Sequence, residues 1–136
     1  MQTHSTVKRV LGHGAAHAAG AFLGMGTWAF IANAGHPLPD ALTAGLVQGS
    51  LSALITALMK KALDAMSARF AAAGAGTMIA LPPAIVWSSS TSVLIAAHAA
   101  AGTPEILATI AVPASVSLAY AITYSLSLWH RRKAAA

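Results

Sequence analysis

Four long runs of apolar residues divide this chain, and they restrict its fold more than any other feature. They cover residues 14–34, 41–59, 75–97 and 105–128. Because a helix rises about 1.5 Å per residue, each run is close to the roughly 20 residues needed to cross about 30 Å of hydrocarbon. No Asp, Glu, Lys or Arg lies deep inside any run. The sequence therefore predicts four transmembrane helices.

The composition supports the same fold class. Hydrophobic residues make up 57% of the 136 residues and charged residues only 8%, whereas about a quarter of a soluble domain is charged. Period-two alternation is absent from the runs, which argues against a transmembrane β-barrel. We predict an all-α membrane protein in which residues 1–136 form a single integral membrane domain, a bundle of four helices.

The basic residues predict the orientation of the bundle. All eight fall at the predicted cytoplasmic ends of the helices, and the loops 33–40 and 99–104 contain none. Because short loops rich in Lys and Arg stay cytoplasmic, we expect both termini inside, in a bacterial cytoplasmic (inner) membrane. The net charge of +5 then serves orientation first and contact with anionic lipid second. The sequence has no basic patch interleaved with aromatic residues, so we do not expect a nucleic-acid partner.

One alternative concerns the first run. Lys8, Arg9 and the later Ala32-Asn33-Ala34 imitate a secretory signal with its cleavage site. The apolar part is longer than the usual 7 to 15 residues of such a signal. We therefore expect a retained helix.

The two halves of the chain align with each other at an offset of about 65 residues, a pattern typical of an internal duplication. The segment that begins at Pro39 aligns with the one that begins at Pro104, and Asn33 aligns with His98. Chance similarity in an Ala-, Ser- and Leu-rich chain is the alternative. A real duplication predicts two parallel-repeat helical hairpins, about 10–70 and 75–130, related by an axis along the membrane normal.

Glycines recur four residues apart in two of the runs and predict close helix packing. Lipid provides no hydrophobic drive for association, so transmembrane helices pack through small side chains. The helix-packing candidates are Gly20, Gly24, Gly45 and Gly49. Their partners are helices of the same chain or of another chain, and the sequence leaves both open.

Polar residues in these runs suggest a belt near the middle of the bilayer. Transporters place substrate sites at the midplane near interrupted helices, and Pro82, Pro83 and Pro113 interrupt two of the runs. The competing hypothesis is that the hydroxyls bond to their own helices or across helices. The substrate-path candidates are Gln48, Ser50, Ser52, Ser88, Ser89, Ser92, Ser115, Ser117 and His98.

The remaining polar residues suggest no catalysis. His13 and His17 share a helix face but lack further metal ligands, and we predict no metal site and no cofactor. Asp40 and Glu105 follow prolines at helix starts, where we expect them to cap. A nucleophilic serine needs a positioned base and an oxyanion site, which the pattern does not supply, so we do not expect an enzyme.

Two functions fit these observations. The first is a small transport protein or channel for a neutral or small solute, acting as an oligomer. The second is a non-transporting membrane subunit or scaffold that binds lipid or another membrane protein through its Gly- and Ser-rich helix faces. The partners that we expect are the bilayer itself and either further copies of the chain or a different membrane protein. A wet polar belt would favour the first function and a dry one the second.

Overall fold

The protein is a bundle of four long helices, as predicted. The computed structural model describes the backbone of residues 3–135 and the side chains of residues 14–135. Each of the four helices is long and apolar enough to cross a membrane, which confirms the prediction of four helices of this length and apolar character. The helices are α1 (Thr3–Ala32), α2 (Leu38–Arg69), α3 (Ala75–Ala100) and α4 (Ile106–Ala134).

The helix boundaries follow from local chain chemistry. Pro37 and Pro39 lie at the start of α2, where a missing backbone N–H costs nothing. Gly74 and Gly102 have φ angles of +86° and +68°, a left-handed conformation that favours glycine, and each lies in a loop that reverses the chain. The segment after residue 59 continues α2 to Arg69, beyond the apolar run.

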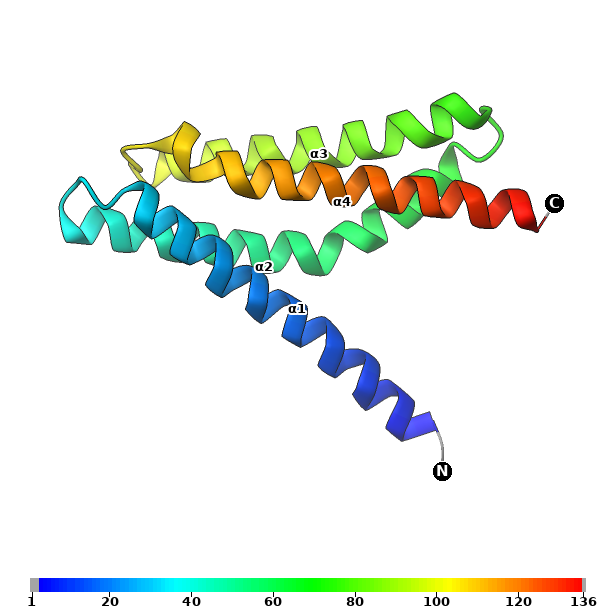
Figure 1. The fold of residues 1–136 in the computed structure, drawn as a ribbon, viewed down its shortest axis with the longest axis horizontal. Coiled ribbons are helices and arrows are strands. Elements are labelled where there is room, and N and C mark those ends of the chain that lie inside the picture. Colours follow the sequence, from blue (N-terminus) through cyan, green and yellow to red (C-terminus); the bar gives the residue numbers. More distant parts are fainter. Residues whose placement is uncertain (1–2, 136) are drawn as a thin grey trace.

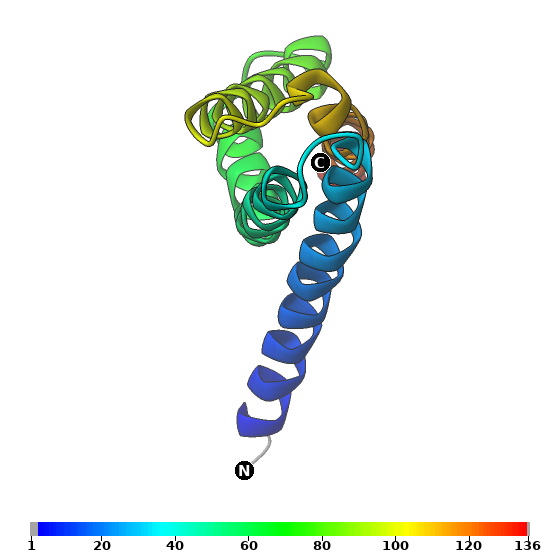
Figure 2. The same ribbon diagram turned by 90° about the vertical axis from the view of Figure 1, so that its left-hand side faces the viewer.

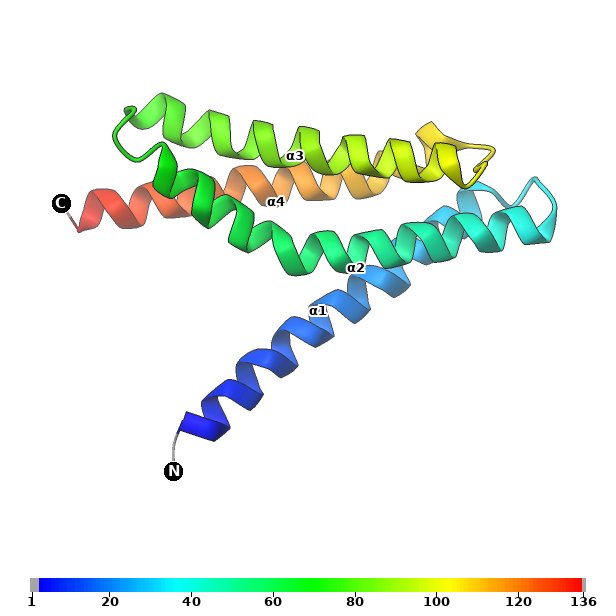
Figure 3. The same cartoon turned by 180° about the vertical axis from the view of Figure 1, so that it is seen from behind.

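Two hairpins, α1 with α2 and α3 with α4, make up the bundle (Figure 1). Helices α2, α3 and α4 lie around a common interior, while the first half of α1 leans away from them (Figure 2). The loops 33–37 and 101–105 lie together at one end, here called the distal end (Figure 3). The α2–α3 loop and the end of α4 lie at the other, here called the basic end.

Helices α1 and α2 cross at a point where only glycine fits. A Cβ atom on Gly26 would lie 2.9 Å from the carbonyl oxygen of Gly45, and one on Gly49 would lie 2.8 Å from that of Phe22. By contrast, no other helix lies within 4 Å of the Cβ position of Gly20 or Gly24. One predicted glycine pair therefore lies in a helix crossing, and the other faces outward.

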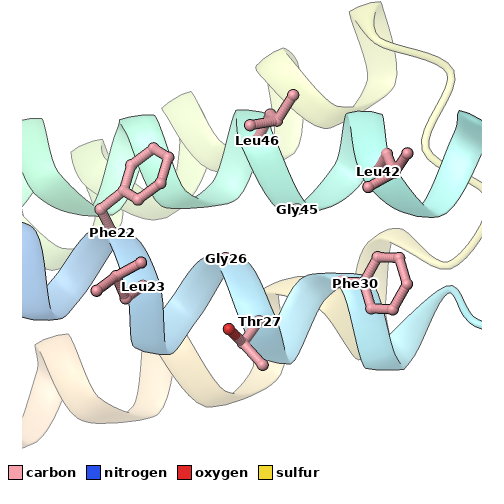
Figure 4. Close-up of a pocket in the computed structure, with 8 residues that line it drawn as sticks. All are labelled: Phe22, Leu23, Gly26, Thr27, Phe30, Leu42, Gly45 and Leu46. Atoms are coloured by element: carbon pink, nitrogen blue, oxygen red, sulfur yellow. The ribbon is translucent and has the colours of Figure 1, made fainter.

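A shallow apolar groove flanks this crossing (Figure 4). Its volume is about 230 Å³, and Thr27 provides the only side-chain oxygen among the residues that line it. The lining residues are Phe22, Leu23, Gly26, Thr27, Phe30, Leu42, Gly45 and Leu46. An open apolar groove on the outside of a membrane bundle suits hydrocarbon, so we do not assign it a polar ligand.

The interior toward the basic end is apolar. Met59 and Leu63 on α2 pack with Ala121 on α4, and Ile55, Val86 and Tyr124 lie against this cluster. Many large apolar side chains point outward instead, among them Leu46 and Leu54, which are more than half exposed. Such a distribution suits a chain whose outer surface contacts lipid rather than water.

Candidate functional site

The most distinctive polar feature is a hydrogen-bonded chain that joins three parts of the bundle. His98 lies in the last turn of α3, and its Nε2 atom is 2.8 Å from Oε1 of Gln48 on α2. Its Nδ1 atom is 2.8 Å from the hydroxyl of Thr103 in the following loop. Gln48 donates from Nε2 to the hydroxyl of Ser52, one turn further along α2, also at 2.8 Å. Gln48 and His98 are completely buried.

The chemistry of Gln48 determines how the protons are arranged. An amide oxygen can only accept, so His98 donates its Nε2 proton to Oε1 of Gln48. In a neutral imidazole, Nδ1 then accepts the proton of the Thr103 hydroxyl. Every donor in the chain then points the same way, from Thr103 through His98 and Gln48 to Ser52, and successive bonds polarise one another. We call these four residues the His98 chain.

A second buried network joins the end of α1 to α4. Asn33 donates to the Thr109 hydroxyl and to the carbonyl of Ala29, both at 2.8 Å. Its side-chain oxygen accepts the backbone N–H of Glu105 at 3.0 Å, and Thr109 donates to the Glu105 carbonyl. Asn33 and Thr109 are completely buried. The two networks together lock one hairpin onto the other at the distal end.

At the distal surface, α2 and α4 each begin beside a carboxylate that we predicted to act as a cap. Glu105 is the N-cap residue of α4 and Asp40 lies in the first turn of α2, as predicted, but neither helix has a side-chain hydrogen bond at its N-cap, so the predicted capping bonds do not form. The carboxylate of Glu105 lies 3.1 Å from Nε2 of His36 instead. A partner in the neighbouring loop competes with the helix N-terminus for the carboxylate, and the sequence spacing does not reveal it.

The predicted belt is only partly brought together. Gln48, Ser52 and His98 meet, whereas Ser50, Ser88, Ser89, Ser92 and Ser115 are exposed on the outside of the chain. Ser117 is partly buried and donates to the Ala114 carbonyl of its own helix. The helices are staggered, so Gln48 in the first half of α2 meets the end of α3, about 9 Å beyond Ser92.

The outward hydroxyls on α3 and α4 differ in their bonding. On α4, Ser115 and Thr123 donate to carbonyls one turn earlier, as hydroxyls in lipid commonly do. On α3, Ser90 does the same, but Ser88, Ser89 and Ser92 form no hydrogen bond with any other residue that the structure describes. Their hydroxyls are therefore free for a group outside the chain.

Sequence reasoning missed several residues of the site. Thr103 and Thr109 belong to no motif that the sequence pattern shows. Gly26 lies two residues beyond the predicted glycine pair of the first helix. One available signal was the alignment of Asn33 with His98, because both prove to be buried and to reach across to the other hairpin.

The part of the chain that the structure describes contains no candidate metal centre. Between residues 14 and 135, no three His, Cys, Asp or Glu side chains come together in a way that could hold a metal ion. His17 is exposed on α1, and the side chain of His13 lies outside the described residues. Comparison with family models, curated proteins and solved structures found no match to this chain.

Proposed function

We propose that the protein is a non-catalytic membrane subunit that acts by associating with further transmembrane helices, first of all with copies of itself. One observation carries the proposal. The span of α1 has the lowest mean hydropathy of the four, 1.2, and the smallest buried share, 11%. The next least buried span is 22% buried and has a mean hydropathy of 1.5.

In α1 the lowest hydropathy thus coincides with the lowest burial, which is the opposite of what a single bundle surrounded by lipid requires. The least apolar helix should be the one that protein covers, while the most apolar helices face hydrocarbon. The uncovered face of α1 includes Gly20 and Gly24, where no atom of another helix approaches a Cβ position. Small residues on such a face allow a neighbouring helix to approach closely. A second chain against α1 would give this span the cover that its own chain does not.

Cysteine cross-linking tests the association directly because the natural chain contains no cysteine. We expect Gly24→Cys to form disulfide-linked dimers in membranes under mild oxidation. Ala119→Cys is the matched control, since residue 119 is also exposed but lies on α4. Equal cross-linking at both positions, or none at residue 24, would contradict the proposal.

A second candidate is a solute conduit formed by the assembled protein. The unbonded hydroxyls of Ser88, Ser89 and Ser92 favour it, because a helix face of this kind would suit a water-lined path between chains. A path inside one chain is not favoured, since the Met59 and Leu63 cluster fills the interior toward the basic end. Impermeant thiol reagents should label cysteines at Ser88 and Ser92 if the conduit exists. Inert cysteines would leave only the first function.

The orientation is part of the proposal. The described Lys and Arg residues from Lys60 onward all lie toward the basic end, so we infer that this end faces the cytoplasm of a bacterial cell. Reporter fusions at Gly35 and Gly102 should then report the periplasm, and those at Arg69 and Lys133 the cytoplasm. A cytoplasmic signal at Gly35 would reverse the assignment.

We also infer that the hairpins arose by duplication. Helices α1 and α3 run in one direction and α2 and α4 in the other. Of the aligned residues, Asn33 directly follows α1 and His98 lies in the last turn of α3, and they bond to the second helix of the other hairpin, at Thr109 and Gln48. Reciprocal contacts of this kind suit two copies of one ancestral hairpin around a shared axis.

A further inference from the structure

We propose that the basic end of the bundle binds the headgroup of an anionic phospholipid between α2 and α4. Among the described residues, the cations at this end outnumber the acids, of which Asp64 is the only one. The cations that we assign to this surface are Lys60, Lys61, Arg131, Arg132 and Lys133, here called the basic rim. The inference does not depend on the proposed association through α1.

Contacts around Asp64 hold the two parts of the basic rim side by side. The Tyr124 hydroxyl on α4 donates to Oδ1 of Asp64 on α2 at 2.8 Å. Lys60 lies 2.8 Å from Oδ2 of the same carboxylate, and Arg131 also acts on Asp64 electrostatically. Asp64 can neutralise only one positive charge. The basic rim therefore keeps a net positive charge after its internal pairing is complete.

The helix lengths place this surface at the edge of the hydrocarbon. A helix that begins at Leu38 has risen about 33 Å by Lys60, and one that begins at Ile106 has risen about 38 Å by Arg131. The hydrocarbon layer is about 30 Å thick. Both parts of the basic rim consequently reach the depth of the lipid phosphates.

Aromatic rings mark the same depth. The Lys60 ammonium lies 5.5 Å from the centre of the Tyr124 ring, and that of Lys133 lies 5.4 Å from the centre of the Trp129 ring. Tyr and Trp prefer the headgroup level of a bilayer. Lys61, Arg131 and Arg132 are exposed and form no ion pair with another described residue. They remain available for a phosphate group, which an anionic lipid presents beside apolar chains.

Thermal unfolding of the full-length protein in detergent tests this site. Phosphatidylglycerol should raise the unfolding temperature roughly twice as much as phosphatidylcholine with the same acyl chains, because each cation near the headgroup contributes to the attraction. Arg131→Gln should remove most of this preference. Arg69→Gln is the matched control, since it removes the same charge from the end of α2, about 13 Å beyond Lys60.

Three outcomes would overturn the inference. One is an equal shift with both lipids, and another is an unchanged preference in Arg131→Gln. The third is an equal shift with inorganic phosphate alone, which would show a phosphate site without a lipid requirement. If Arg131→Gln does not fold, Lys61→Gln provides the same comparison on α2, and it should also weaken the preference for phosphatidylglycerol.

Discussion

At the scale of single residues, buried polar side chains in this protein hold helices together through hydrogen bonds. Gln48 and His98 have no contact with water, so each must find its partners within the protein. They satisfy each other, and Thr103 and Ser52 satisfy what remains. The cost of removing one partner is then larger than the value of the bond itself, because the other partner is left buried and unbonded.

A double-mutant cycle measures the coupling energy between Gln48 and His98. We expect Gln48→Leu to destabilise the bundle by about 1–3 kcal/mol, since the Nε2 proton of His98 loses its acceptor. The double variant Gln48→Leu with His98→Leu should lose less than the sum of the two single variants, because neither polar group is then left alone. Unfolding in detergent monitored by circular dichroism gives the comparison. Strict additivity would mean that the two side chains are not coupled.

Glycines allow a second test at this scale, because they differ in what surrounds them. Gly26→Ala should destabilise the protein by about 1–3 kcal/mol, since its Cβ would meet the backbone of Gly45. Gly24→Ala meets no neighbouring helix and should leave the stability of one chain nearly unchanged. Unfolding at a protein concentration that favours separate chains distinguishes them. Equal losses would contradict the described crossing of α1 and α2.

At the scale of helices, the sequence predicted correctly that four helices exist and in which order they follow, but it predicted poorly which helices contact one another. Apolar runs determine where a chain can cross a bilayer, and all four runs became helices. Periodicity does not determine how far one helix is shifted along another. For this reason Gln48 was expected at the level of Ser88 to Ser92, whereas the stagger of α2 and α3 places it beside His98. The glycine pair on α1 was identified without any means of knowing which helix, if any, it faces.

The different bonding of the hydroxyls on α3 and α4 predicts which of these two helices is accessible to water. A cysteine at residue 115 should be inert to membrane-impermeant thiol reagents, because α4 shows the self-bonded hydroxyls of a lipid-facing helix. If α3 lines a wet surface, cysteines at residues 88 and 92 should react, and they share one face because they lie one turn apart. Labelling of α4 with inert positions on α3 would reverse these roles.

At the scale of the whole molecule, the chain is fastened at both ends and only partly covered along its length. The two polar networks hold the distal end, and the Tyr124–Asp64 hydrogen bond with the Met59, Leu63 and Ala121 cluster joins α2 to α4 toward the basic end. The first half of α1 leans away from the other helices (Figure 2). The span of α1, the least apolar of the four, is therefore only slightly covered by the rest of the chain. We infer from this that one chain is part of a larger assembly.

The mass of the protein in lipid nanodiscs tests this inference most directly. We predict that the natural chain, extracted without harsh detergent, has the mass of at least two copies. Gly24→Leu should shift it toward a single copy while the helix content stays unchanged, because that position touches no other helix of its own chain. A natural chain that remains a single folded copy in nanodiscs, with α1 facing only lipid, would contradict the account.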